Sequence, residues 1–208
     1  MNSPVSDVFV VDSVKNTEYE RYLYRCFAPM PFRRYKKRRE YLKTAAERGL
    51  RKKILFFKGK AVGQIEYAPA EASGYPIFGE RLVVMNCLWV LRKAKGNRFG
   101  RLLVDEMIKD NRDASGFSTI GLENHWSPWM KKEHMELFDF KSIDSLRVFH
   151  KMKRMSECFR IHLMWLPNKG GELPVWSKSR LLAGIDFCMA HPLYHPEGLK
   201  AGKVLQEC

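Results

Sequence analysis

The sequence of 208 residues lacks the features that would assign it to a membrane or secreted class. It has no apolar run approaching the roughly 18 uninterrupted residues that a membrane-spanning helix requires. Residues 1–12 contain two acids and no basic residue, a composition that argues against a secretory signal peptide. We therefore expect a cytoplasmic protein without a membrane partner.

Cysteine is scarce and its spacing is uninformative. The five cysteines are odd in number, widely scattered and without any C-x-x-C pair, which argues against zinc ribbons, redox dithiols and disulfide frameworks. We expect them to be reduced. His191 and His195 are four residues apart, but Pro192 and Pro196 argue against the helix that would bring both to one zinc ion. No metal site is predicted.

Acidic residues are too few to balance the basic ones. Lys and Arg total 37 against 23 for Asp and Glu, so the formal charge is +14. This excess predicts a polyanionic partner, such as nucleic acid or a phosphorylated cofactor or substrate. Eleven of the basic residues lie between positions 33 and 53, with Leu42, Ala45 and Leu50 among them at helical intervals. That run predicts a basic helix with one buried stripe.

Apolar periodicity and turn residues predict alternating strands and helices. The run 82–91 is apolar apart from Asn86, as expected of a strand covered on both faces in the middle of a sheet. A single domain is expected over 1–167, with a loop-rich extension, 168–208, packed on it. The expected strands are 7–11, 53–57, 61–66, 82–91, 117–122, 145–150 and 158–166. The expected helices are 17–27, the basic helix that starts near residue 33 and ends near Gly49, 101–109 and 128–138.

The most informative segment joins the central strand to the helix 101–109 through a basic, glycine-containing turn. The free backbone N–H groups at a helix start and the helix dipole both favour an anion. Gly96 and Gly100 would let the backbone approach a phosphate, and Lys93, Lys95, Arg98 and Arg101 add positive charge. The segment matches neither the Walker A pattern nor the Rossmann G-x-G-x-x-G pattern. It predicts a pyrophosphate site.

This segment resembles the acetyl-CoA signature of the GNAT N-acetyltransferase superfamily. In that signature a strand ending L-x-V is followed five residues later by Q/R-x-x-G-x-G/A. Leu88 and Val90 match the strand, Lys95 stands at the Q/R position, Gly100 is the last glycine, and Arg98 replaces the middle glycine. The residues that the resemblance places at the cofactor are Leu88, Trp89, Val90, Lys95, Gly96, Asn97, Arg98, Phe99, Gly100 and Arg101.

The resemblance covers residues 7–166 through the order of elements. It implies an α/β fold with a mixed, mostly antiparallel central sheet flanked by helices on both faces. It also implies acetyl-CoA as co-substrate and direct attack of a primary amine on its thioester. A backbone N–H near the end of the central strand would polarise the thioester carbonyl. Either a monomer or a homodimer is compatible with the resemblance.

The groups that would transfer protons are less well defined. A carboxylate would serve as general base, and the family's usual acid, a tyrosine, aligns with Met135. His134, Glu133 or a water are the substitutes that remain. Cys87 would act only in a ping-pong route. The candidate catalytic residues are Glu66, Glu123, His134 and Cys87.

Two other functions remain open. Interleaved basic and aromatic residues would suit RNA, although no RNA-binding signature is present, so nucleic acid is possible but not favoured. Arg98 and the missing tyrosine also fit a GNAT fold that binds CoA without transferring acetyl. The sequence does not identify the amine acceptor.

Overall fold

The computed structural model describes residues 7–27, 36–151, 157–195 and 202–208. The first residues of the expected basic helix, 33–35, lie outside these ranges, as does Pro196. The strands are β1 (Val8–Asp12), β2 (Arg51–Phe57), β3 (Lys60–Pro69), β4 (Ile77–Phe78), β5 (Leu82–Val90), β6 (Gly116–Glu123), β7 (Lys141–His150), β8 (Phe159–Pro167), β9 (Val175–Trp176) and β10 (Leu205–Glu207). The helices are η1 (Thr17–Tyr19), α1 (Glu20–Leu23), α2 (Lys36–Glu47), η2 (Ala70–Ala72), η3 (Arg92–Ala94), α3 (Phe99–Asp110), α4 (Lys132–Glu136) and α5 (Lys178–Leu182).

Eight strands form one sheet in the order β1-β2-β3-β5-β6-β8-β7-β10. Every neighbouring pair is antiparallel except β5 and β6, which are parallel. The first six residues of β5 are buried, as the apolar run predicts for a central strand. The predicted mixed, mostly antiparallel fold class is confirmed.

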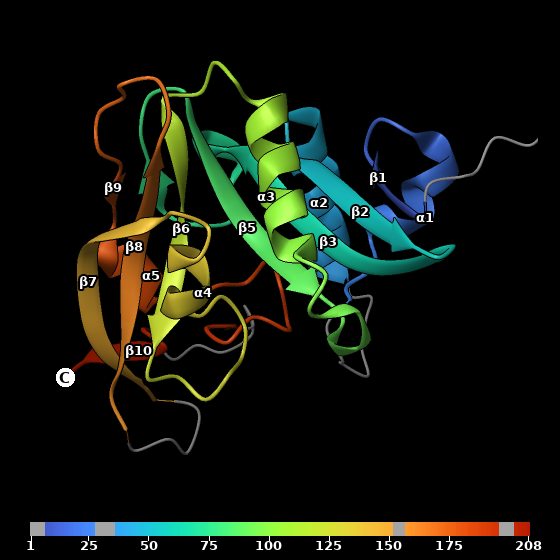
Figure 1. Ribbon diagram of the computed structural model, residues 1–208. Coiled ribbons are helices and arrows are strands. Elements are labelled where there is room, and N and C mark those ends of the chain that lie inside the picture. Colours follow the sequence, from blue (N-terminus) through green and yellow to red (C-terminus); the bar gives the residue numbers. More distant parts are fainter. Residues whose placement is uncertain (1–6, 28–35, 152–156, 196–201) are drawn as a thin grey trace, which may run out of the picture.

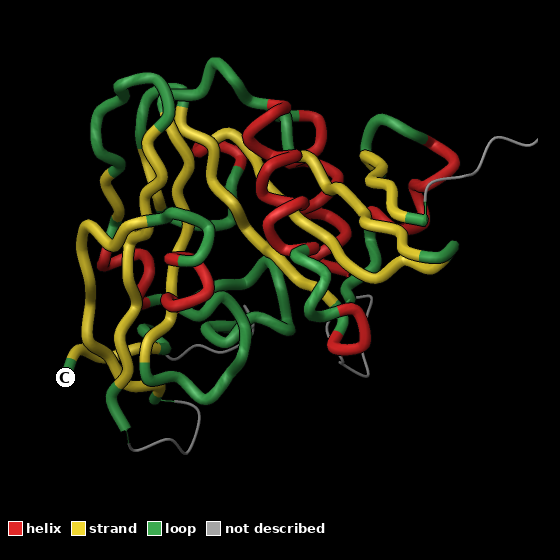
Figure 2. The backbone as a smooth tube through the Cα atoms, viewed as in Figure 1, coloured by secondary structure: helices red, strands yellow, loops and turns green. Residues whose placement is uncertain are grey.

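Helices cover both faces of the sheet (Figures 1 and 2). Consecutive strand residues point to opposite faces, and two neighbours on β3 show which helix lies where. Glu66 forms an ion pair with Arg38 of α2. The hydroxyl of Tyr67 donates a hydrogen bond of 2.7 Å to Asp110 of α3. Helices α2 and α3 therefore lie on opposite faces, with β3 and β5 between them.

Two expected helices are shorter than the sequence predicts. The ammonium of Lys52 donates to the carbonyls of Leu23 (3.1 Å) and Arg25 (2.6 Å), replacing the amide donors that would continue α1. Trp129 and Met130 form a turn beside β6, where the Leu122 N–H donates to the Met130 carbonyl at 2.9 Å and Lys131 forms an isolated bridge with Leu122. Helix α4 can begin only after that contact.

The C-terminal extension contains more regular structure than the expected loop-rich tail. Strand β9 pairs with β4 in a separate two-stranded sheet, and β10 pairs with β7 at the edge of the main sheet. Helix α5 lies between these two strands in the chain. The extension thus adds a strand to the main sheet itself.

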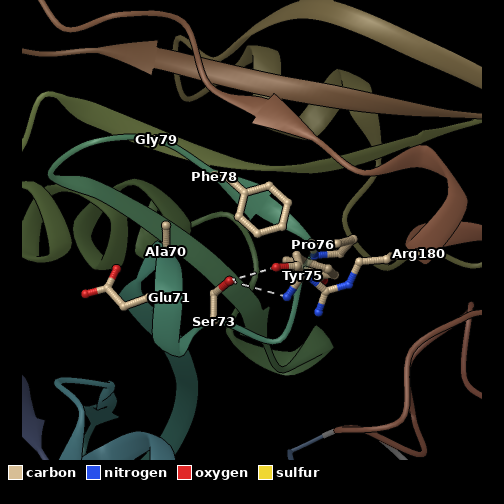
Figure 3. Close-up of a pocket in the computed structure, with 8 residues that line it drawn as sticks. All are labelled: Ala70, Glu71, Ser73, Tyr75, Pro76, Phe78, Gly79 and Arg180. Carbon is tan, nitrogen blue, oxygen red and sulfur yellow. Dashed lines mark hydrogen bonds between the residues drawn. The ribbon is translucent and has the colours of Figure 1, made fainter.

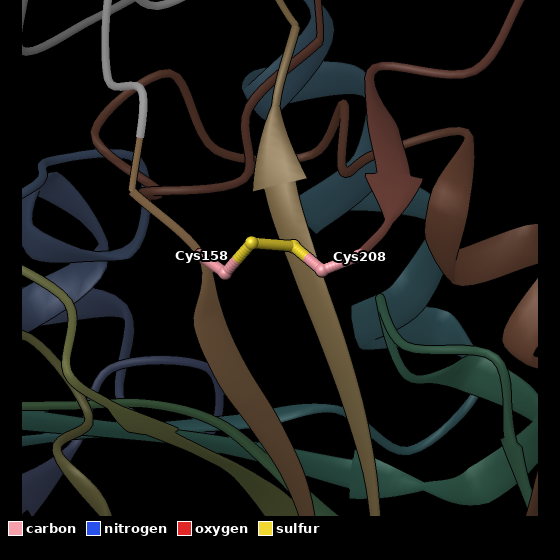
Figure 4. Close-up of a disulfide and its surroundings, with 2 residues drawn as sticks. All are labelled: Cys158 and Cys208. Atoms are coloured by element: carbon pink, nitrogen blue, oxygen red, sulfur yellow. A yellow bond between two sulfur atoms is a disulfide. The ribbon is translucent and has the colours of Figure 1, made fainter.

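The expectation that all cysteines are reduced was wrong. Cys158 and Cys208 form a disulfide across 50 positions of sequence (Figure 4). Strand β10 pairs with β7, and beyond it the Cys208 N–H donates to the Arg147 carbonyl of β7 at 3.1 Å. The spacing of the cysteines in the sequence does not predict that Cys158 and Cys208 are close in space. Cys26, Cys87 and Cys188 are not in disulfides.

Within the described residues, no helix has the length and apolarity needed to cross a membrane.

The disulfide predicts the number of thiols that can react and a contribution to the free energy of unfolding. Under denaturing, non-reducing conditions, titration with Ellman's reagent should find three free thiols, and five after reduction. Cys208→Ser should lower the free energy of unfolding by up to about 4 kcal/mol, because the loop it closes spans 50 residues. Urea denaturation measures this. Cys188→Ser, which removes a free thiol, is the control, and five reactive thiols before reduction would contradict the pairing.

Candidate functional site

The sheet opens between β5 and β6. Their parallel pairing covers Leu82 to Val84 opposite Gly116 to Ser118 and then stops. One further contact joins the strands, a 2.7 Å hydrogen bond from the Thr119 hydroxyl to the Met85 carbonyl. Beyond it, β5 stays paired with β3 on its other edge, and β6 with β8. The last residues of β5 thus present an edge to which β6 does not pair.

A bulge in β5 lies where the strands separate. Glu66 is opposite Cys87 and Tyr67 is opposite Met85, so Asn86 is the extra residue. The Asn86 amide donates to the Tyr41 hydroxyl at 2.5 Å and accepts from the Gly74 N–H at 3.3 Å.

Further contacts connect the bulge to the C-terminal extension. The Tyr75 hydroxyl donates to the Asn86 carbonyl at 3.1 Å. The same hydroxyl lies 2.9 Å from Nε2 of His191. Helix α2, the loop before β4 and the extension therefore all fix the backbone of β5 at the point of opening.

The basic turn after β5 has a sharply constrained backbone. Gly96 has φ +86° and Arg98 has φ +54°, both in the left-handed region. The Asn97 amide donates to the carbonyls of Ala94 (3.1 Å) and Lys95 (3.3 Å) and so closes the turn. Arg98 immediately precedes α3, whose N-terminus has no side-chain cap. The N–H groups of this helix start therefore remain available to an anion.

Two residues of the signature have roles that the sequence does not reveal. A Cβ at Gly100 would lie 2.8 Å from the Phe138 ring, so this glycine permits close packing of α3 against the end of α4. Arg101 is held by Asp139 at 2.8 Å and by the Leu137 carbonyl. The exposed cations of the turn are Arg92, Lys93, Lys95 and Arg98.

Glu66 lies on the α2 side of β3 and is fully buried. Its carboxylate pairs with Arg38 and, at 2.9 Å, with Lys52. Burial alone would raise the pKa of Glu66, but the two cations outweigh it and hold the pKa below the ordinary value. A carboxylate in this state is a poor general base, although it holds cationic partners well.

Cys87 is the register partner of Glu66 and is also buried. Burial, with the nearby Glu66 carboxylate, raises the pKa of the thiol to about 12. The Gln64 amide donates to its sulfur at 3.4 Å. A protonated thiol is not an effective nucleophile, so the geometry gives the ping-pong route no support.

Glu123 lies at the end of β6 and faces the side of the sheet that α4 covers. Its carboxylate is 3.3 Å from Nε2 of His162, whose Nδ1 lies 2.8 Å from the Ser142 hydroxyl. Burial lowers the pKa of His162 despite the neighbouring carboxylate, so the imidazole is neutral near pH 7. His134 is exposed on α4. The four candidate catalytic residues thus divide between the two faces, with Glu66 and Cys87 on one and Glu123 and His134 on the other.

The partners of these residues, Arg38, Lys52, Gln64 and His162, were not predicted from the sequence, and neither was the contact of Tyr41 with Asn86. Polar residues at alternating positions of the hairpin, Lys52 and Gln64 with Glu66, were the available signal, because alternation places them on one face. Among the described residues, no group of three His, Cys, Asp or Glu side chains is arranged to hold a metal ion.

A separate hollow of about 430 Å³ lies beside β4 (Figure 3). It is lined by Glu71, Ser73, Tyr75, Phe78 and Arg180, with the Arg180 guanidinium 5.7 Å from the Phe78 ring centroid. None of its lining residues belongs to the basic turn or to β5.

Solved structures of GNAT acetyltransferases share this fold. A GNAT family acetyltransferase from Elizabethkingia anophelis with acetyl-CoA bound is 12% identical, with a TM-score of 0.50 over 78% of this chain and 99% of that chain. An N-acetyltransferase from Staphylococcus aureus Mu50 is 10% identical, with a TM-score of 0.52 over 78% and 99%. Arabidopsis thaliana Naa50, in complex with the bisubstrate analogue CoA-Ac-MVNAL, is 14% identical, with a TM-score of 0.51 over 75% and 97%.

By sequence, no family model matches the chain and no curated protein is significantly similar to it. The structural likeness confirms the predicted resemblance to the GNAT superfamily at the level of the fold.

The buried ion pairs of Glu66 predict a large effect on stability. Glu66→Gln leaves Arg38 and Lys52 without their counter-ion and should lower the free energy of unfolding by about 3–5 kcal/mol. The control is Glu133→Gln, because the ion pair of Glu133 with Lys131 is largely exposed and should contribute at most about 1 kcal/mol. Urea denaturation measures both variants.

The wild-type stabilisation has a defined pH dependence. Since the folded pKa of Glu66 lies below the unfolded one, its contribution is complete above the ordinary glutamate range. It is lost only as the pH falls through the lower folded value. Equal losses of stability in Glu66→Gln and Glu133→Gln would contradict the ion pairs of Glu66 described above.

Proposed function

We propose that this chain is an N-acetyltransferase that transfers the acetyl group of acetyl-CoA to a primary amine. One observation carries the proposal: β5 separates from β6 after three paired residues, and the uncapped N-terminus of α3 follows the open end of β5. An extended thioester arm and a pyrophosphate, joined in one molecule, match this combination of strand edge and helix start. The GNAT fold supports the same conclusion.

In the proposed complex, the pyrophosphate lies at the start of α3 beside Lys95 and Arg98. The pantetheine arm follows the edge of β5 that β6 leaves unpaired, between Leu88 and Val90. A backbone N–H on that edge hydrogen-bonds the thioester carbonyl and stabilises the negative charge that develops on its oxygen.

Acetyl transfer then proceeds by direct attack, because the Cys87 thiol is protonated. The amine nitrogen bonds to the carbonyl carbon, the carbon–sulfur bond breaks, and the thiolate of CoA takes up a proton. Two protons leave the ammonium form of the substrate overall, one of which ends on the thiol and one in solvent. Our candidate for the residue that exchanges a proton during the reaction is His162, which is neutral, is oriented by Glu123 and lies on the α4 side of the sheet. His134, which is exposed on the same side, is the alternative.

Arg98 provides the test of the binding site. Isothermal titration of acetyl-CoA should show binding to the wild type, and Arg98→Glu should weaken it by about tenfold or more, because it places a negative charge beside the pyrophosphate. Arg98→Gly should fold normally and lose less affinity, since glycine adopts the left-handed conformation without strain. Arg112→Glu, an exposed charge reversal beyond the other end of α3, is the control.

Each result separates the competing functions. No acetyl-CoA binding by the wild type would overturn the proposal, and salt-dependent retention of RNA would then be measured. Binding without turnover on any amine would indicate a CoA-binding GNAT fold that lacks transferase activity.

A further inference from the structure

The three cysteines outside the disulfide come from distant parts of the chain and gather around one buried arginine. Cys26 follows α1, Cys87 lies in β5, and Cys188 lies in the C-terminal extension. The Arg38 guanidinium, which is 2% exposed, interacts electrostatically with the thiols of all three. Two of these thiols are in direct contact, because Cys188 donates a hydrogen bond to the Cys26 sulfur. The proposed acetyl transfer uses none of them.

Contacts of successive residues hold this part of the extension against α2. Asp186 forms an ion pair with Lys37 at 3.1 Å. The ring of Phe187 packs on that of Tyr41, with the two centroids 5.2 Å apart. Cys188 comes next in the chain and is partly buried against the main core. The backbone that carries this thiol is therefore anchored on α2.

The backbone before Cys26 is anchored by the buried ion pairs. The ammonium of Lys52 donates to the Arg25 carbonyl at 2.6 Å and pairs with Glu66 at 2.9 Å. Glu66 also pairs with Arg38, the residue beside all three thiols. The two hydrogen-bonded thiols therefore meet from two anchored segments near opposite ends of the chain.

The two thiols differ in their ability to act as a nucleophile. The hydrogen bond to Cys26, together with burial, raises the pKa of the Cys188 thiol well above its ordinary value, so Cys188 keeps its proton. The Cys26 sulfur accepts that hydrogen bond and lies near the Arg38 guanidinium, and both interactions favour a negative charge on it. Since the thiolate is the form that attacks a disulfide, Cys26 is the first thiol of the pair to react.

A hollow of about 390 Å³ gives access to Cys26, which lines it. The exposed cations Arg25, Lys60 and Lys93 line the same hollow, and none of the described residues around it is acidic. Such a lining attracts an anionic reagent. Cys87 is exposed to the same extent as Cys26, 8%, but lines neither this hollow nor the one beside β4.

We propose that Cys26 and Cys188 are a redox pair that forms a second disulfide on reaction with a small anionic disulfide, for which oxidised glutathione is the probe. The Cys26 thiolate attacks one sulfur of the reagent, which forms a mixed disulfide and releases a thiolate that takes a proton from solvent. The Cys188 sulfur then attacks the Cys26 sulfur, and its proton passes to the second thiolate that leaves. The pair is oxidised by two electrons, and the reagent is reduced to two thiols.

The new bond would join the end of α1 to the C-terminal extension across α2. The extension supports the bulge of β5, because His191 contacts the Tyr75 hydroxyl that donates to the Asn86 carbonyl. Oxidation would therefore fix the frame of β5 covalently as well as by packing. The redox pair does not depend on the acetyltransferase function, so either proposal can fail alone.

The test treats the native full chain with oxidised glutathione, alkylates the remaining thiols in denaturant and maps the disulfides by mass spectrometry. We expect Cys26 linked to Cys188, Cys158 still linked to Cys208, and Cys87 alkylated. The number of thiols then falls from three to one.

Matched substitutions to alanine, a small residue that suits a buried cysteine position, localise the reaction. Cys188→Ala should stop at a mixed disulfide between Cys26 and glutathione, formed at least about tenfold faster than any adduct of Cys87, whose pKa is about 12. Cys26→Ala should form no cross-link. Cys87→Ala is the control and should form the cross-link at the wild-type rate. Thermal unfolding checks that each variant folds, and the disulfide map of the wild type decides if one does not.

Three results would overturn the redox pair. In the first, all three thiols remain after treatment. In the second, glutathione adducts form on Cys26 and Cys188 without a bond between them. In the third, the cross-link contains Cys87, Cys158 or Cys208 in place of one member of the pair.

Discussion

The pairing of β5 with β6 ends after three residues, and the candidate site depends on this incomplete ladder. Unpaired backbone groups inside a sheet are costly, so two neighbouring strands normally stay paired along their shared length. Here β5 pairs with β3 on its outer side, apart from the bulge at Asn86, and β6 pairs with β8 along its whole length. The sheet can therefore divide into β1-β2-β3-β5 and β6-β8-β7-β10 while each half stays paired. The Asn86 bulge lies at the point of separation, where the Thr119 hydroxyl donates to the Met85 carbonyl. The open edge that results is a place where a ligand's amide groups can substitute for a missing strand.

The bulge itself is fixed by polar groups that are distant in sequence. Tyr41, the loop at Gly74 and Tyr75, and His191 converge on Asn86, which is buried. Removing one of these partners would leave a buried donor or acceptor unsatisfied, at a cost of about 1–3 kcal/mol. The C-terminal extension is therefore part of the frame of the site, since His191 supports Tyr75 and β10 adds to the main sheet. A truncated chain ending at β8 would lose one of the contacts that set the position of the central strand.

Local patterns explain what the sequence could predict. The apolar run of β5, the glycine turn between β2 and β3, and the periodicity of α3 are properties of short segments, and the structure confirms each. Long-range contacts explain the errors. Lys52 ends α1 early, β6 delays α4, and β10 brings Cys208 to Cys158. The same division applies to the site. The turn 93–100 was visible in the sequence, whereas Arg38 could not be distinguished from the solvated cations around it until the fold placed it on Glu66.

Arg98 combines two locally unfavourable features, and their coincidence has a physical explanation. A left-handed backbone costs a residue with a side chain roughly 1–2 kcal/mol relative to the usual conformation, and glycine would avoid most of that cost. A cation immediately before α3 also opposes the helix dipole, and the first turn contains no acid to compensate. Neither feature contributes to the stability of the free protein. Both become favourable when an anion binds there, because the left-handed turn exposes the backbone N–H groups and the guanidinium adds to their positive field. Under the proposed function, the segment thus favours phosphate binding at the expense of the stability of the helix that follows it.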